Sequence, residues 1–98
     1  LFKVTPIYPR RAQERGIMGY AVVAFTITET GTVENTEPLE GFCGDPTDPE
    51  TVYRECSIFN SAAERAATKL KYKPKIVDGK AVRVDNVPHK FTFILEES

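Results

Sequence analysis

The side chains best suited to chemistry in this 98-residue chain are two cysteines, Cys43 and Cys56, and a single histidine. The cysteines flank a stretch rich in proline and aspartate, a composition typical of a loop. Two cysteines near the ends of one flexible loop can meet, and closing a loop of this size stabilises a fold by about 3 kcal/mol. We therefore expect a Cys43–Cys56 disulfide formed in an oxidising compartment, with two unrelated free thiols as the alternative.

The other reactive side chains indicate no catalytic residue, metal site or cofactor. A metal centre needs more ligands than two cysteines, and His89 is the only histidine. His89 follows Pro88 at the start of an expected strand, where a half-exposed structural histidine is the simpler interpretation. The carboxylates are not paired in the sequence, and no nucleophile elbow, P-loop, dinucleotide-binding or HExxH pattern occurs. We expect the protein not to be an enzyme.

Composition narrows the class of protein. A chain of this length forms one domain with a small core, since 41% of its residues are hydrophobic. The net charge of −1 argues against nucleic-acid binding, and the local basic clusters at 10–11 and 69–75 are interpreted as solvated surface. No run approaches the ~20 apolar residues of a membrane span, and nothing resembles a signal peptide. Because the chain begins at Leu1, without a methionine, we expect a piece of a longer protein.

The strongest structural signal is a change of hydrophobic period between Phe59 and Ile76. Apolar residues first recur at steps of three and four, which places them on one stripe of a helix: Phe59, Ala62, Ala63, Ala66, Ala67 and Leu70. Polar and apolar residues then alternate, which predicts a strand whose buried face carries Tyr72, Pro74 and Ile76. An alanine-rich helix face can pack very close to a sheet, and Ser57 is the expected N-cap.

A short helix is expected near the N-terminus. Pro9 suits its first position, because the fixed φ of proline matches a helix and its missing N–H would have no partner there. Gly16 is placed to end the helix in the left-handed conformation. Tyr8 and Ala12 are one turn apart, so both can face the sheet.

A β-hairpin is expected next. Its first strand covers 19–28, and the inward face carries the larger apolar side chains: Ala21, Val23, Phe25 and Ile27. The outward face is also apolar at Tyr20 and Val22, which reflects β-propensity alone or a second copy that covers it. A turn at Gly31 leads to a weaker strand over 33–39, where Pro38 indicates an edge or a bulge.

The C-terminal third predicts further strands. Asp78–Gly79 is the strongest turn signal and joins the strand after the helix to another. After an interruption at 86–88, alternating residues predict a closing strand that ends near Leu95. The order helix, hairpin, helix and further strands predicts an α+β fold, a two-layer sandwich in which a three-stranded antiparallel sheet carries two helices on one face.

Motifs that carry a family resemblance are spread over nearly the whole chain. They are, in order, Pro6-x-Tyr8-Pro9-x-x-Ala12-x-x-x-Gly16, Gly31-x-Val33, Phe59-x-x-Ala62-Ala63-x-x-Ala66, Leu70-x-Tyr72-x-Pro74, Asp78-Gly79 and Phe91-x-Phe93-x-Leu95. In this order they resemble the C-terminal domain of TonB, the energy transducer of Gram-negative bacteria. The resemblance implies one domain over 1–98 with a core from about 6 to 95. Two departures are Leu70, where a tryptophan is usual, and a long cysteine-bounded insertion at about 41–57.

The resemblance implies a protein that binds a partner and transmits force. In the family, an N-terminal helix, absent here, is anchored in the inner membrane beside a motor of the ExbB/ExbD type, and the C-terminal domain lies in the periplasm. That domain binds the TonB box, a short peptide of outer-membrane receptors that import iron siderophores or vitamins. The implied function is coupling of proton-motive force to nutrient import, without a cofactor or nucleic acid.

The sheet suggests how a receptor peptide binds. A three-stranded sheet keeps at least one edge unpaired, and the closing strand from Lys90 is expected to contain no proline, so we predict β-augmentation there. The rings of its two phenylalanines are expected in the core, so the edge role belongs to the backbone. The resemblance adds residues at the Tyr-Pro motif, and two arginines provide electrostatic steering. The predicted partner-binding residues are Thr5, Pro6, Ile7, Tyr8, Pro9, Arg10, Arg11, Lys90, Phe91, Thr92, Phe93, Ile94 and Leu95.

Two alternatives belong to other classes of protein. The same fold could serve as a structural or assembly domain that forms a homodimer through its sheet edge and never meets a receptor. A secreted cystatin-like inhibitor also packs a helix on an antiparallel sheet, but the QxVxG hairpin loop that such inhibitors need is absent.

Overall fold

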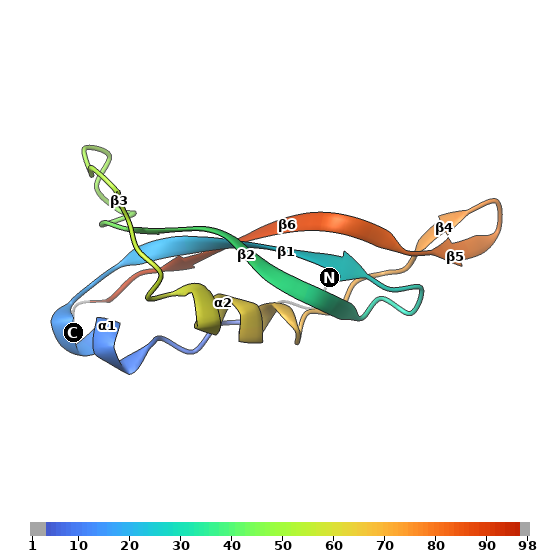
Figure 1. Cartoon of the computed structure of the whole chain (residues 1–98), viewed down its shortest axis with the longest axis horizontal. Helices are drawn as coiled ribbons and strands as arrows, with labels where there is room; N and C mark the ends of the chain where they lie inside the picture. The colour runs from blue at the N-terminus through green and yellow to red at the C-terminus, as the bar shows by residue number, and fades with distance from the viewer. Residues whose placement is uncertain (1–3, 97–98) are drawn as a thin grey trace.

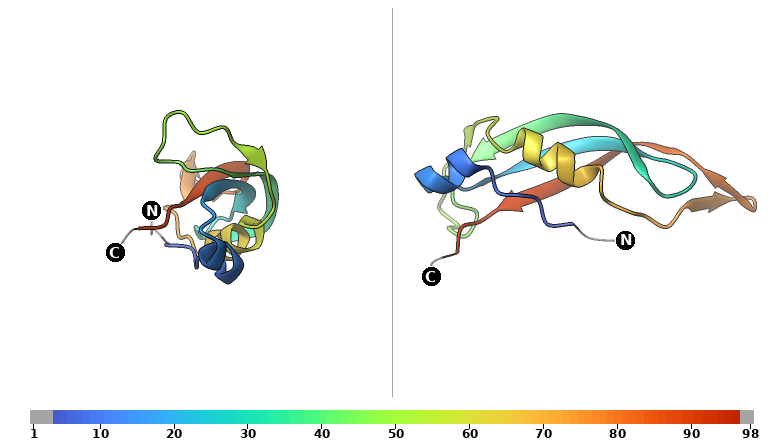
Figure 2. Two further views of the ribbon diagram at one scale, coloured as in Figure 1. Left: turned by 90° about the vertical axis from the view of Figure 1, so that its left-hand side faces the viewer. Right: turned by 90° about the horizontal axis from the view of Figure 1, so that it is seen from below.

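The computed structural model describes residues 4–96. Along the chain run α1 (Arg10–Arg15), β1 (Gly19–Ile27), β2 (Val33–Cys43), β3 (Arg54–Glu55), α2 (Asn60–Ala67), β4 (Lys75–Val77), β5 (Lys80–Val82) and β6 (Val84–Phe93). Four strands form an antiparallel sheet in the order β3-β2-β1-β6, and both helices lie on one face of it (Figure 1 and Figure 2). The predicted α+β fold is confirmed, and the sheet gains a short strand, β3, that the sequence did not predict. Neither helix of this part of the chain is long and apolar enough to cross a membrane.

The core lies between β1 and α2. Ala21, Val23 and Phe25 on β1 are at most 2% exposed, as their alternation predicts. The predicted helical stripe is also buried in full: Phe59, Ala62, Ala63, Ala66, Ala67 and Leu70. Because this stripe is mostly alanine, α2 packs close to β1 and β2. The sheet itself is equally tight at Gly19, where a Cβ would lie 2.1 Å from the carbonyl oxygen of Phe42.

The short N-terminal helix forms almost as predicted. It begins at Arg10, with Pro9 as the extended N-cap residue rather than the first helical residue. It ends at Gly16, whose φ of +66° is the left-handed conformation predicted for it, and the Gly16 N–H donates to the carbonyl of Gln13 (3.3 Å). Ala12 is fully buried, so the helix faces the core as expected.

The prediction of Ser57 as the N-cap of the second helix is wrong. α2 begins at Asn60, with Phe59 in the cap position and no side-chain cap. Ser57 contributes its carbonyl instead, which accepts a hydrogen bond from the Asn60 N–H (3.1 Å). The physical reason is that the N–H of Cys56 donates to the carbonyl of Gly41 (3.1 Å). The chain is therefore still tied to β2 just before Ser57, and it needs one further turn before it enters the helix.

A strand follows α2 as expected, but the buried face predicted for it is wrong, because the strand does not join the main sheet. The Asp78–Gly79 turn forms as predicted, with φ of +51° and +79°, but β4 and β5 pair only with each other. They form a ribbon that projects from one end of the molecule (Figure 1). The longest extent of the molecule is 49 Å. Of the residues predicted to be buried, Tyr72 packs on the core, whereas Pro74 and Ile76 are exposed. Both sides of β1 are already paired, which leaves no place beside it for β4.

β2 is longer than predicted and shortens the insertion that follows it. The strand runs to Cys43 instead of ending at Leu39, and β3 pairs with its last two residues. The irregularity predicted at Pro38 is confirmed, because the register with β1 shifts there and leaves Leu39 as the extra residue of a bulge. The part of the insertion outside regular strands is therefore 44–53.

Candidate functional site

Within residues 4–96, the side of β6 that faces away from β1 has no partner strand. β6 ends the strand order, so one row of its backbone N–H and C=O groups is left unpaired. The closing strand was predicted to run from Lys90 to Leu95. In the structure it begins earlier, at Val84, and it also ends earlier, at Phe93. Ile94, which is 45% exposed, and the half-buried Leu95 lie beyond it. The expected free edge is present, over a different range of residues.

A proline inside β6 corrects one expectation about this edge. Pro88 lies opposite Ala24 of β1, whereas the closing strand was expected to contain no proline. Proline is tolerated in an edge strand where its missing N–H would point away from the sheet. Alternate residues of a strand direct their backbone groups to the same side, so Lys90 and Thr92 share the free side with Pro88. The usable edge therefore starts at Pro88, and Lys90 and Thr92 supply its N–H donors.

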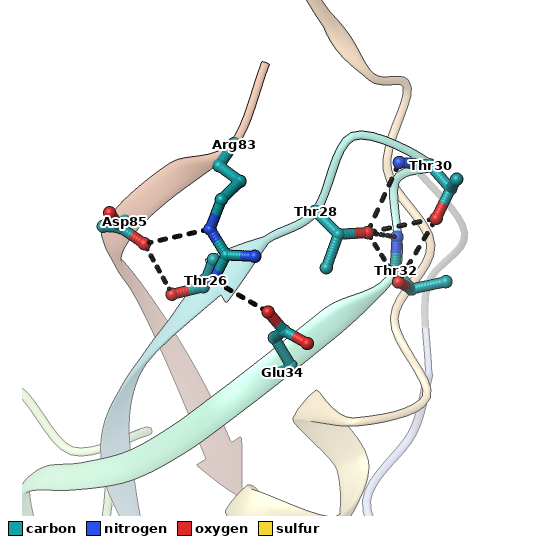
Figure 3. Close-up of polar contacts among 7 residues, drawn as sticks. All are labelled: Thr26, Thr28, Thr30, Thr32, Glu34, Arg83 and Asp85. Atoms are coloured by element: carbon teal, nitrogen blue, oxygen red, sulfur yellow. Dashed lines mark hydrogen bonds and ion pairs between the residues drawn. The ribbon is translucent and has the colours of Figure 1, made fainter. Parts of the chain in front are cut away.

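Polar contacts across the sheet fix the beginning of β6 (Figure 3). The Thr26 hydroxyl donates a hydrogen bond to the carboxylate of Asp85 (2.9 Å), and Arg83 forms an ion pair with Glu34 of β2 (2.7 Å). Asn86 adopts a φ of +56° where the register between β1 and β6 shifts. Because this bulge bends the strand, the regular part of the free edge lies after it.

Side chains alternate between the core and the outer face along the free edge. Phe91 and Phe93 are 4% and 2% exposed, so their rings belong to the core and only their backbone can meet a partner. Thr92 is exposed on the outer face. Lys90 is also exposed, and its Nζ lies 4.2 Å from the centre of the Tyr20 ring, a cation–π contact across the sheet. A strand docked on this edge would therefore meet a hydroxyl and a cation on the outer side.

Tyr8 brings the N-terminal segment against β6. Its ring packs edge-on against Phe93, with centroids 5.7 Å apart, and against Phe59 at 5.8 Å. Its hydroxyl donates a hydrogen bond to the carbonyl of Ile17, and burial raises the pKa of the phenol. Residues 4–7 continue past α2 (Figure 2). Their side chains and those of α2 line a narrow crevice. Tyr8 thus joins two predicted binding segments that are far apart in the sequence.

The other predicted residues of the N-terminal segment differ in exposure. Ile7 is 76% exposed and Thr5 is exposed, while both prolines of the segment are half-buried. Arg10 and Arg11 are exposed on α1, at the same end of the molecule as the last residues of β6 (Figure 1). Among residues 4–96 neither arginine forms an ion pair. Their charges are therefore available to an approaching partner.

A disulfide ties the insertion to the sheet. Cys43, the last residue of β2, is bonded to Cys56, just after β3, with Cα atoms 5.7 Å apart. Inside the loop, the carboxylate of Asp45 accepts hydrogen bonds from the N–H and the hydroxyl of Thr47 (2.8 and 2.6 Å). These bonds favour the ionised carboxylate and so lower the pKa of Asp45. The insertion is therefore held both at its base and within its loop.

Sequence reasoning missed an aromatic cluster beside the free edge. Tyr53, from the insertion, packs edge-on against Tyr20 of β1 with ring centroids 5.2 Å apart, and Phe42 packs against Tyr20 at 5.4 Å. With Lys90 above the same Tyr20 ring, this cluster links the insertion to β6. The outer face of β1 is therefore covered in part by the chain's own insertion. The signal available in the sequence was a tyrosine close to the second cysteine. The disulfide folds this loop back toward the sheet, so an aromatic side chain there can reach the outer face of β1.

His89 lies on the core side of β6, beside aromatic rings. Its ring contacts those of Phe25 and Phe91, with centroids 6.4 and 4.6 Å away, and burial lowers the pKa of the imidazole. In the described part of the chain, no group of three or more His, Cys, Asp and Glu side chains is placed to hold a metal ion. What the site offers is backbone hydrogen bonding with a few polar and aromatic side chains beside it.

Known proteins share this sequence and fold. The family model described as the Gram-negative bacterial TonB protein C-terminal matches residues 4–41. Protein TonB of Pseudomonas aeruginosa strain PAO1 is 32% identical over 77 residues, which cover 79% of this chain and 19% of that protein. The chain thus spans about a fifth of the length of this curated relative.

Two solved structures have the same architecture. The solution NMR structure of the Pseudomonas aeruginosa TonB C-terminal domain has a TM-score of 0.70 and 31% identity, over 100% of this chain and 86% of that one. The TonB2 protein of Vibrio anguillarum has a TM-score of 0.63 and 31% identity, over 99% and 80%. The identity to a TonB protein over more than two thirds of the chain, together with this shared fold, shows that the chain belongs to the TonB C-terminal domain family.

Proposed function

We propose that this domain is the receptor-binding end of a TonB-type energy transducer. In this role it lies in the periplasm and binds the TonB box of outer-membrane receptors. It passes on force from an inner-membrane motor of the ExbB/ExbD type, to which it is connected through an N-terminal anchor. This force drives the import of scarce nutrients, such as siderophore-bound iron or vitamins, through the receptor. Family membership and the disulfide, which suits an oxidising compartment, both support this proposal.

The observation that carries the proposal is the unpaired edge of β6 after Pro88. A receptor peptide in extended form can add there as a further strand, with its backbone bonded to Lys90 and Thr92. Main-chain hydrogen bonds of this kind do not depend on the side chains of the peptide, so peptides of many sequences can bind. This suits a domain that serves more than one receptor. Because the grip is a ladder of hydrogen bonds, a pull along the bound peptide loads several bonds together. No step of this function requires a catalytic residue.

Side chains around the edge would add specificity. Thr92 and Lys90 face the outer side of a docked strand, and Ile94 extends the line just past the end of β6. On the helix side, Ile7 is an exposed apolar residue next to Tyr8, which touches β6. We therefore expect a peptide with an apolar side chain toward Ile7 and a polar or acidic one toward Lys90.

A peptide titration followed by NMR tests this function. A synthetic TonB-box peptide should shift the amide signals of residues 88–96 and 5–9 of the chain. A matched peptide, N-methylated at alternate amides that face β6, keeps every side chain but cannot form the ladder, and it should not bind. N-methylation at the amides that face away should leave binding intact. The absence of shifts in both segments would refute the proposal.

A second candidate function is assembly of the chain with itself. The same unpaired edge of β6 could pair antiparallel with its own copy, which would make a symmetric dimer with one continuous sheet. Sedimentation at micromolar concentration discriminates the two functions. A tight dimer that ignores the receptor peptide would favour assembly, whereas a monomer that binds the peptide would favour the receptor-binding role.

A further inference from the structure

The segment that contains the β4–β5 ribbon carries a large share of the positive charge of the chain. Six of the 13 Lys and Arg residues lie between Lys69 and Arg83, with Asp78 the only acidic residue there. Arg83 is paired with Glu34. The five lysines form no ion pair with residues of the described range 4–96: Lys69, Lys71, Lys73, Lys75 and Lys80. Like charges gathered without counter-charge repel one another, and an anionic partner would relieve that repulsion.

The same ribbon exposes apolar side chains at its tip. Ile76 is 60% exposed and Val77 is 45% exposed, directly before the turn. Val77 lies opposite Lys80 in the ladder, so the two share one face of the ribbon. Every residue from Lys73 to Ala81 is exposed. The ribbon is therefore amphiphilic, which an ordinary solvated run of lysines is not.

The shape of the ribbon limits the kind of partner that it fits. It projects from one end of the elongated molecule (Figure 1). Each of its strands has three residues. A stable protein interface buries about 800 Å² on each side, more than so small a projection offers. A bilayer surface, by contrast, accepts a convex tip. Apolar side chains enter the interface there, while lysines extend to anionic headgroups.

We propose that the β4–β5 ribbon docks on the surface of bilayers that contain anionic phospholipid. Lys75 and Lys80 bind the lipid phosphates, and Val77, which shares their face of the ribbon, enters the headgroup region. The ribbon lies at the opposite end of the molecule from α1 and the last residues of β6 (Figure 1). The contact therefore leaves the free edge accessible, and it does not depend on receptor binding. It would hold the domain by one end beside a membrane while the other end stays open to a partner.

Vesicle co-sedimentation of the 98-residue chain tests this proposal. The chain should bind vesicles of phosphatidylglycerol and phosphatidylcholine in equal parts, and it should not bind pure phosphatidylcholine. Each lysine near an anionic surface contributes about fivefold in affinity, so K75Q/K80Q should bind about 25-fold more weakly. The control R15Q/R54Q removes the same charge from exposed positions on α1 and β3 and should bind as the parent does. Equal losses in both variants would overturn the proposal, as would no binding of the parent chain.

A second variant separates docking from simple charge attraction. Val77→Ser keeps every charge but removes the exposed apolar side chain on the face of Lys75 and Lys80, and it should weaken vesicle binding several-fold. Lys75, Val77 and Lys80 are all exposed, so neither K75Q/K80Q nor Val77→Ser should change the midpoint of thermal unfolding. If the parent chain instead self-associates through the ribbon and ignores vesicles, the docking proposal is overturned. Titration of K75Q/K80Q with a TonB-box peptide should match the parent, so this proposal and the receptor-binding role fail independently.

Discussion

The two edges of the main sheet differ in how they are supported. On the β2 side, α2 packs beneath the sheet, β3 adds a short strand, and the Cys43–Cys56 bond joins the two strands. The bulge at Leu39 interrupts what remains of that edge. On the β6 side, the ring of Tyr8 packs against Phe93. Within residues 4–96, the row of backbone groups after Pro88 has no partner strand. The comparison teaches that this sheet is reinforced at one end of its β2 side, whereas its β6 side carries no added strand within residues 4–96.

The largest expected effect is on the reinforced side. Replacing both cysteines in Cys43→Ser/Cys56→Ser removes a cross-link over a short loop and should lower the free energy of unfolding by about 3 kcal/mol. Urea denaturation, compared with that of the oxidised parent, measures the change. Peptide binding at β6 should survive wherever the variant is folded. Equal stability of the variant and the oxidised parent would mean that the staple does not support the β2 side.

A second effect should arise where α2 touches the sheet. Ala63 is fully buried in that contact, so Ala63→Leu overpacks it and should cost about 1–3 kcal/mol of stability. Ser61→Leu adds a leucine at an exposed position of the same helix and should change stability little. The thermal unfolding midpoints of the two variants test whether Ala63 lies on the buried face. Similar midpoints for both would show that the buried stripe has been assigned wrongly.

A smaller effect is expected on the β6 side. Tyr8→Phe keeps the ring against Phe93 but removes the hydrogen bond to the carbonyl of Ile17, which should cost about 1 kcal/mol. The loss of this hydrogen bond should also raise the hydrogen-exchange rate of the Phe93 amide. Tyr53→Phe, which also removes only a hydroxyl, should leave that exchange rate unchanged. If the two variants behave alike, Tyr8 is not the support of this side.

The smallest effect is a pH dependence. Burial lowers the pKa of His89 below its ordinary value of 6.5, so the unfolded chain takes up this proton first as the pH falls. Stability should therefore decrease as the pH is lowered through 6.5 toward the folded pKa, and it should be constant with respect to this group above that range. His89→Gln should flatten this part of the profile. A parent profile that rises toward low pH in the same window would contradict the assignment.

Much of the fold followed from local pattern. The alanine stripe of α2, the inward face of β1, the αL glycine after α1 and the Asp78–Gly79 turn all depend on neighbouring residues, and the structure has each of them. The position of the β4–β5 ribbon was not predictable in this way. Its alternation is that of a half-buried strand, but burial depends on whether an edge of the sheet is free, and both sides of β1 were taken.

The candidate site was predictable only in outline. An unpaired last strand follows from strand order, but its extent depends on a bulge at Asn86 and on Pro88, which local alternation treats as an interruption. The contact between Tyr8 and Phe93 joins the two ends of the chain, and only tertiary packing sets it. The same holds for Tyr53, since the disulfide and the turn of its loop bring it over Tyr20.

The most direct test of the open edge is calorimetric titration of Thr92→Pro with a TonB-box peptide. The Thr92 N–H faces outward, so proline removes a donor that only the partner uses. The variant should then be as stable as the control Thr92→Ala and bind the peptide about tenfold more weakly than that control does. Equal peptide affinity of the two variants, or unfolding of Thr92→Pro because its N–H was bonded to β1, would contradict the account.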